Sequence, residues 1–228
     1  MTATTIADVR HCIEDLYPTN SIFRKFLLFG RPSICPFHSL IDSVPDGSSV
    51  LDIGCGAGLF LNVLAYRGKI SRGVGFDAAL APVEIAREAG RHNRVGKNLV
   101  FEHVAVEANW PAGQFDVVSM IDVIHHVSPG AQRGAIEQAV KKVAPGGLFL
   151  FKDIAVRPLW RAWANRLHDL VMARQWIHYV PSEKVVDWVE NAGLKLQRRE
   201  TINMLWYGHE LLAFRRDAAD TDRRLTRS

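Results

Sequence analysis

The sequence predicts an α/β fold, an open and mostly parallel seven-stranded sheet with helices on both faces and an antiparallel last strand. From about residue 49, short apolar runs alternate with helical patterns, which is typical of parallel strands joined by helical crossovers. The apolar runs are nearly continuous, so we expect strands that are buried on both faces of the sheet. Two late strands follow one another without a crossover helix and can pair antiparallel.

The expected elements follow the chain in a regular order. The strand and helix runs are SVLDIG then LFLNVLAYRG, RGVGFD then ALAPVEIAREAGRH, NLVFEHVAV, FDVVSMID then AQRGAIEQAVKKVAPGG, LFLFKDI, LKLQRRETI and MLWYGHELLAFRR. Pro82 is compatible with the first turn of a helix that begins near Ala79. The run Ala144-Pro145-Gly146-Gly147 terminates the helix before it. Several boundaries therefore have a local physical signal.

A chain of 228 residues is long enough for one sizeable core, and we expect a single domain. Its expected parts are an N-terminal helical cover (1–45), a core (46–155), a helical cap insertion (156–193), a C-terminal strand pair (194–216) and a disordered tail (217–228). Insertions on a regular sheet usually carry function. The cover and the cap are therefore candidate substrate covers.

Composition places the protein among ordinary globular chains. Hydrophobic residues at 48% and charged residues at 23% exclude collagen, coiled coil and general disorder. Three cysteines without C-x-x-C spacing predict neither a disulfide framework nor a zinc site, and no His and carboxylate cluster has metal-ligand spacing. The charged N-terminus and the absence of a run of roughly 18 apolar residues predict a cytoplasmic protein without a leader or span. A net charge of +4 suits an acidic substrate, an anionic membrane surface or a nucleic acid.

The turn after the first strand, Asp52-Ile53-Gly54-Cys55-Gly56-Ala57-Gly58, has glycine at alternate positions. In open α/β sheets the first strand-to-helix turn commonly meets a nucleotide, and glycine lets a ligand lie against the backbone. The dinucleotide fingerprint G-x-G-x-x-G requires glycine where this chain has Leu59. The turn therefore departs from the usual NAD pattern.

The run VLDIGCGAG resembles motif I of the class I S-adenosylmethionine-dependent methyltransferases. Three further features in the family's order extend the resemblance over roughly residues 49–154: GVGFD, FDVVSMIDVIHHV and VAPGGLF. The resemblance implies an S-adenosyl-L-methionine cofactor, S-adenosyl-L-homocysteine as product and no metal. It further implies cofactor binding by Asp52, Gly54, Cys55, Gly56, Gly58, Asp77, Ala105 and Asp122.

For some of these residues more than one role in cofactor binding is open. By resemblance Asp77 binds the ribose, whereas Asp52 binds the methionine ammonium through water or braces the glycine loop. Many relatives have an acid near the adenine where this chain has Ala105, so adenine is held by backbone and apolar packing, or by Glu107 or Asn109. Cys55 is expected to be a packed thiol rather than a nucleophile.

His125 and His126 follow the fourth strand, where the family delivers its loop beside the methyl group. If the substrate is a hydroxyl, a histidine with an ordinary pKa of about 6.5 can act as general base, and His126 is slightly preferred. The alternative is that one ring only caps or packs. His168, Tyr179 and Tyr17 are the candidate substrate contacts.

The cap insertion carries an apolar stripe with helical spacing and a basic remainder. The stripe is formed by Trp160, Trp163, Leu167, Leu170 and Val171. Such a helix can cap a pocket for an acidic or amphipathic substrate, contact an anionic membrane surface from the cytoplasm, or dock its stripe on the sheet.

The expected reaction is direct in-line methyl transfer to a small-molecule or lipid-like acceptor, with oxygen, nitrogen and carbon all open as nucleophiles. Catalysis then consists mostly of positioning and desolvation. The alternatives are an NAD-dependent oxidoreductase, against which Leu59 and Asp52 argue, and a non-catalytic S-adenosylmethionine-binding protein. A nucleic-acid substrate is disfavoured because no N/D-P-P-Y/F motif follows the fourth strand.

Overall fold

The computed structural model describes residues 4–18, 35–92, 95–106, 108–154, 178–204 and 207–218. The chain divides into two compact units, Met1–Pro111 and Ala112–Ser228. Most of the predicted cap, including its apolar stripe and His168, lies outside the described residues, as do residues 219–228 of the predicted tail. The single domain, the cap and the tail stay predictions.

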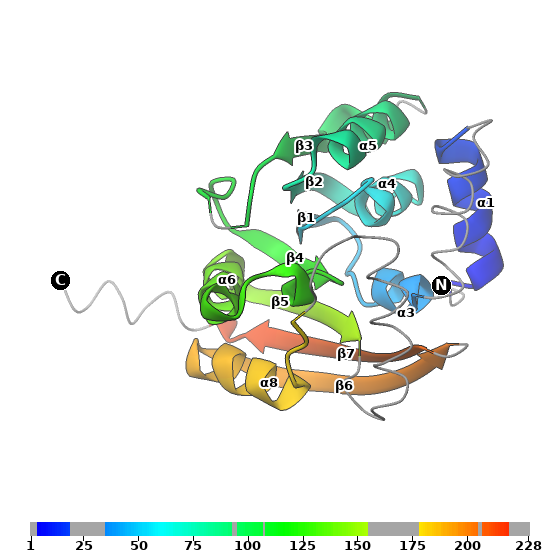
Figure 1. Cartoon of the computed structure of the whole chain (residues 1–228). Helices are drawn as coiled ribbons and strands as arrows, with labels where there is room; N and C mark the ends of the chain where they lie inside the picture. The colour runs from blue at the N-terminus through cyan, green and yellow to red at the C-terminus, as the bar shows by residue number, and fades with distance from the viewer. Residues whose placement is uncertain are drawn as a thin grey trace. The chain divides into compact units, whose positions relative to one another are not determined.

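The first unit contains three parallel strands in the order β3-β2-β1 (Figure 1). They are β1 (Ser48–Ile53), β2 (Ile70–Asp77) and β3 (Leu99–His103). Asp52 pairs in register with Gly75, and Asp77 pairs with His103. The carboxyl ends of the strands therefore meet at one edge. The expected third strand, residues 98–106, is shorter in the structure because the chain leaves the sheet after His103.

The helices of the first unit lie where the sequence pattern predicted helices. They are α1 (Ile6–Leu16), α3 (Phe37–Asp42), α4 (Leu59–Tyr66), α5 (Leu80–His92) and the 3-10 turn η1 (Val95–Asn98). The apolar helix α4 packs on all three strands, and α1 packs against α3, α4 and α5. A capping box starts α1, since Thr5 Oγ1 accepts from the Asp8 amide while Asp8 Oδ2 accepts from the Thr5 amide.

The second unit contains four strands in the order β4-β5-β7-β6. They are β4 (Phe115–Ile121), β5 (Val143–Ile154), β6 (Leu194–Met204) and β7 (Tyr207–Arg216). β4 and β5 are parallel, whereas β7 is antiparallel to both β5 and β6. Aromatic side chains fill its core, with the rings of Phe149 and Phe214 stacked 6.1 Å apart.

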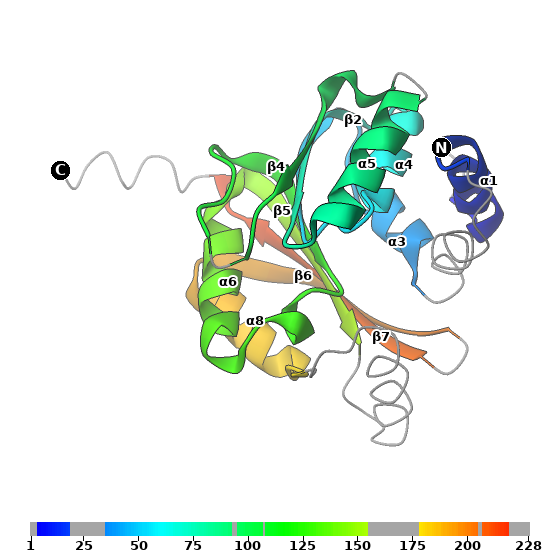
Figure 2. The same ribbon diagram turned by 45° about the horizontal axis from the view of Figure 1, so that its top comes forward.

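Two helices and a 3-10 turn complete the second unit: η2 (Ile124–His126), α6 (Pro129–Lys141) and α8 (Ser182–Asn191). α6 and α8 lie side by side (Figure 2). β5 begins at Val143 and so includes the Pro-Gly-Gly turn that was expected to precede it, with Gly146 at φ +74°. Across the described residues the two units supply the seven strands of a mixed sheet with an antiparallel last strand, which confirms the predicted fold class.

Candidate functional site

The glycine loop after β1 uses the left-handed backbone region three times. The φ angles are +67° at Gly54, +53° at Gly56 and +71° at Gly58. The Cys55 amide donates to the Phe76 carbonyl at 2.9 Å, which ties the loop to β2. Since residues with a side chain rarely adopt such angles, the loop conformation depends on glycine.

The two later glycines of the loop serve different purposes. A Cβ on Gly58 would lie 2.6 Å from Ala86 Cβ and 2.8 Å from Phe101 Cε1. A Cβ on Gly56 would meet nothing within 4 Å. Gly58 therefore permits close packing of the loop on the protein, whereas Gly56 faces open space from which a ligand can approach the backbone.

This contrast gives a paired prediction. We expect Gly58→Ala to lower the free energy of unfolding by about 1–3 kcal/mol more than Gly56→Ala, because overpacking adds to the backbone strain that both variants share. Gly56→Ala should instead act mainly on ligand binding. Urea titrations of both variants measure the difference, and equal losses of stability would contradict the assignment.

Asp77 joins the glycine loop to the helix that follows β2. Its Oδ2 accepts a hydrogen bond from the Gly56 amide at 2.8 Å, and its Oδ1 accepts one from the Ala79 amide at 2.9 Å. The half-buried carboxylate lies at the end of β2 and binds the turn between β2 and α5. A carboxylate has about four lone-pair sites, so two amide donors leave acceptor capacity for ligand hydroxyls.

The remaining cofactor candidates of this unit differ in exposure. Asp52 and Cys55 are buried, whereas Ala105 and Asn109 are exposed and Glu107 lies outside the described residues. Burial, then the charges of Asp52 and Asp77, raises the pKa of the Cys55 thiol. A raised pKa disfavours the reactive thiolate, which agrees with a packed thiol. The cofactor roles of these residues stay predictions.

Tyr17 lies at the end of α1 with 5% of its surface exposed. Its hydroxyl donates to the carbonyl of Ala57 in the glycine loop at 2.9 Å and accepts from Asn62 Nδ2 at 3.1 Å. The predicted substrate role of Tyr17 is untested, but its observed partners belong to the loop and α4. Sequence reasoning missed Asn62, although a polar residue inside the apolar run LFLNVLAY was a usable signal.

Asp122, at the end of β4, has an unusual backbone and a buried cation as partner. Its φ is +56°, it is the one non-glycine residue with positive φ among the described residues, and its amide donates to the Lys152 carbonyl at 2.9 Å. Lys152 Nζ lies 2.6 Å from Asp122 Oδ1, and the lysine side chain is only 1% exposed. Residues in sparsely populated conformations persist only where surrounding contacts hold them, and here Lys152 supplies two such contacts. No sequence pattern indicated Lys152 as a partner of Asp122.

This ion pair gives a second prediction. We expect Asp122→Asn to lower the free energy of unfolding by about 3 kcal/mol, because it removes the carboxylate charge that lies 2.6 Å from the buried Lys152 ammonium. Asparagine tolerates the left-handed region, so the variant isolates the charge. The exposed pair Lys195–Asp217 is the matched control, and Asp217→Asn should cost less than about 1 kcal/mol. Equal effects in chemical denaturation would contradict the role of burial.

His125 and His126 lie together in η2, and His125 contacts the carboxylate of Asp153. Its Nδ1 lies 2.5 Å from Asp153 Oδ1, and both side chains are buried. The His126 ring is exposed and 4.2 Å from the His125 ring. A carboxylate at Nδ1 assigns the proton to that nitrogen and leaves Nε2 as an acceptor. Sequence reasoning missed Asp153, which follows Lys152 on β5 but contacts a different residue, His125.

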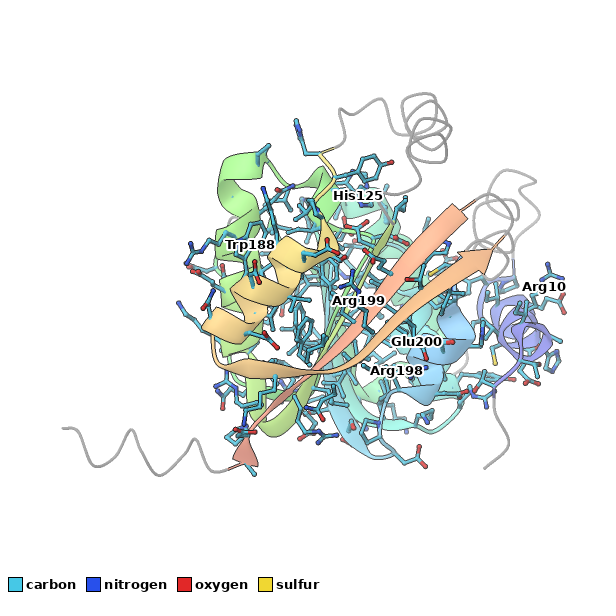
Figure 3. The ribbon with its side chains drawn as sticks, turned by 90° about the horizontal axis from the view of Figure 1, so that it is seen from below. Arg10, His125, Trp188, Arg198, Arg199 and Glu200 are labelled. Carbon is cyan, nitrogen blue, oxygen red and sulfur yellow. The ribbon has the colours of Figure 1, made fainter. Side chains whose placement is uncertain are left out.

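The turn that carries His125 is fixed by the chain leading into α8 (Figure 3). The His178 amide donates to the His125 carbonyl at 2.9 Å, and Gln132 Nε2 donates to the carbonyls of Ile124, Val127 and His178. Tyr179 consequently lies with its ring 6.0 Å from that of His125. The predicted substrate candidate Tyr179 and the candidate base are thus brought together, whereas His168 is outside the described residues.

Neither a metal cluster nor a membrane span is found in the part of the chain that the structure describes. No group of three or more His, Cys, Asp and Glu side chains there is arranged to hold a metal ion. No helix there is long and apolar enough to span a bilayer.

A sequence model of the methyltransferase domain matches residues 32–198, which is well over half of the chain. The chain belongs to this methyltransferase family. Among its relatives is the ubiquinone biosynthesis O-methyltransferase of Acinetobacter baylyi, 33% identical over 165 residues that cover 66% of this chain and 65% of the relative. The methyltransferase thus spans less than two thirds of the length of that curated relative.

Solved structures agree with this membership at the level of the fold. An O-methyltransferase family protein from Burkholderia thailandensis has a TM-score of 0.68 at 20% identity, covering 94% of the methyltransferase and 72% of that chain. The N-methyltransferase NodS from Bradyrhizobium japonicum, solved with S-adenosyl-L-homocysteine, has a TM-score of 0.64 at 22% identity, covering 91% and 97%. The resemblance to class I S-adenosylmethionine-dependent methyltransferases is therefore confirmed.

Proposed function

We propose that this methyltransferase transfers a methyl group from S-adenosyl-L-methionine to a hydroxyl of a small-molecule or lipid-like acceptor. The bound cofactor supplies a methyl group already activated by a sulfonium. The residues of the first unit fit such a molecule, because Gly56 offers open backbone and Asp77 offers a fixed carboxylate for ribose hydroxyls. NodS, solved with S-adenosyl-L-homocysteine, supports the same choice of cofactor.

The observation that carries the choice of a hydroxyl is the buried pair His125–Asp153. A hydroxyl must lose its proton as the new oxygen–carbon bond forms, and a neutral histidine can take it. Asp153 orients the ring and stabilises the imidazolium that results, so Nε2 of His125 is the proposed proton acceptor. The oxygen lone pair then becomes available for the methyl carbon, and the proton remains on His125 until solvent removes it.

The relatives support an oxygen nucleophile on a small acceptor. Relatives from Saccharophagus degradans and Acinetobacter baylyi are named for O-methylation in ubiquinone biosynthesis, at 29% and 33% identity. For a lipid-like acceptor, we expect a cytoplasmic protein whose predicted cap contacts the membrane surface. Membership of the methyltransferase family disfavours the NAD-dependent oxidoreductase, and the non-catalytic alternative becomes an outcome of the test.

The test is methyl transfer from isotopically labelled S-adenosylmethionine to a panel of phenols, aliphatic alcohols and amines. We expect labelled product with hydroxyl-bearing acceptors. Transfer to amines alone would contradict the hydroxyl assignment. Cofactor binding without transfer to any acceptor would support the non-catalytic alternative instead.

A further inference from the structure

Tyr17 connects the N-terminal helix to the glycine loop, and this contact has a consequence for cofactor binding. We infer that α1 is a working part of the cofactor site, and that Tyr17 is a positioning residue which couples docking of α1 to cofactor affinity. The inference rests on the proposed function, since it concerns the site proposed for S-adenosylmethionine. It assigns Tyr17 to the loop rather than to the acceptor.

The contact between Tyr17 and the glycine loop is formed by buried, hydrogen-bonded side chains. Tyr17 is buried at the end of α1, and its hydroxyl is used as donor to Ala57 and as acceptor from Asn62. Asn62 is fully buried in α4 and also donates to the carbonyl of Ala86 in α5 at 3.2 Å. One hydrogen-bonded network therefore joins α1, the glycine loop, α4 and α5.

The network acts on the peptide group at which the loop turns into α4. The carbonyl of Ala57 is held by Tyr17, and the amide of Gly58 in the same peptide group donates to the Cys55 carbonyl at 2.9 Å. Both polar atoms of this peptide are thereby fixed. Burial raises the pKa of the Tyr17 hydroxyl, which keeps it a neutral donor at physiological pH.

Fixing this peptide before the ligand arrives removes an ordering cost from binding. Coupling of this kind is reciprocal, so a ligand that favours the ordered loop must also favour docked α1. The helix that supplies Tyr17 should therefore become harder to open when the cofactor product is bound.

The chain offers a matched control for the test. Tyr66 in α4 also donates its hydroxyl to α1, to Asp15 Oδ2 at 2.5 Å, but this contact lies at the exposed side of the helix. Tyr17→Phe and Tyr66→Phe each remove one hydroxyl and one tie between α1 and the body of the unit. Only the first removes a bond to the glycine loop.

Calorimetric titration with S-adenosyl-L-homocysteine gives the first readout. We expect Kd to rise about five- to tenfold in Tyr17→Phe, the loss expected for one or two buried hydrogen bonds, and to stay within about twofold in Tyr66→Phe. Hydrogen exchange gives the second readout. The product should slow exchange of the α1 amides in the wild type and in Tyr66→Phe, and less so in Tyr17→Phe.

The possible failures are distinguishable. Equal affinity of Tyr17→Phe and the wild type, with equal protection of α1, would overturn the coupling while leaving the proposed function intact. Absence of binding to the wild type would overturn the proposed function and the coupling with it. A purely structural role would lower the thermal midpoint of Tyr17→Phe without changing Kd, and this result also counts against the inference.

Discussion

His125→Ala is expected to lower kcat by about 100-fold or more while leaving the affinity for S-adenosylmethionine unchanged, because removal of a general base typically costs 10²–10⁴ in rate. The His125 ring contacts Asp153, and His125 is buried in a turn whose Ile124 and Val127 carbonyls accept hydrogen bonds from Gln132. Single-turnover methyl transfer with an active hydroxyl acceptor measures the rate, and calorimetry measures the affinity.

Two companion variants separate the roles at this turn. Asp153→Asn should lower kcat as well, since the asparagine no longer fixes the productive tautomer of His125 or balances the charge of the imidazolium. His126→Ala should lower kcat by less than about tenfold, because the proposed base is the buried His125 ring beside Asp153, whereas the His126 ring is exposed. A larger loss in His126→Ala than in His125→Ala would assign the base to His126.

Asp77→Ala is expected to weaken S-adenosylmethionine binding by at least about tenfold, because hydrogen bonds to a charged carboxylate contribute roughly 1.5–3 kcal/mol. The variant also removes the acceptor of the Gly56 and Ala79 amides. We therefore expect a further loss of about 1 kcal/mol in the free energy of unfolding, as for the loss of a helix cap. The protein should nevertheless stay folded.

Asp46→Ala is the control for the change of charge in the same unit. Asp46 pairs with Lys69 at 3.1 Å, and its side chain is 56% exposed and does not belong to the glycine loop. Its removal should leave the affinity for the cofactor within about twofold, since the Asp46 carboxylate pairs with Lys69 and not with the glycine loop. Unchanged affinity in Asp77→Ala would show that the ribose assignment is wrong.

The parallel core could be predicted because its signals are local. Continuous apolar runs marked β1, β2, β4 and β5, and the Asp52–Gly58 turn marked the point where the chain needs positive φ. The helix after Asp77 begins at Leu80, which places Pro82 in its first turn as expected. Each of these features is decided by residues within one turn or one strand, so the sequence displays it directly.

Partners that depend on long-range packing could not be predicted. Asp153 and His125 are 28 positions apart, Lys152 and Asp122 are 30 apart, and Tyr17 and Asn62 are 45 apart. Neighbouring residues on a strand point to opposite faces, so Lys152 and Asp153 reach different partners only once β5 is placed beside β4. The slight preference for His126 has the same origin, because the sequence does not show which of the two rings the fold buries.

Calorimetric titration of the purified protein with S-adenosylmethionine, S-adenosylhomocysteine and NADH, after any co-purified ligand has been removed, tests most directly whether the glycine loop and Asp77 form the cofactor site. We predict micromolar binding of the first two ligands, no binding of NADH, and loss of binding in Asp77→Ala. Binding of NADH, or of none of the three, would contradict the account.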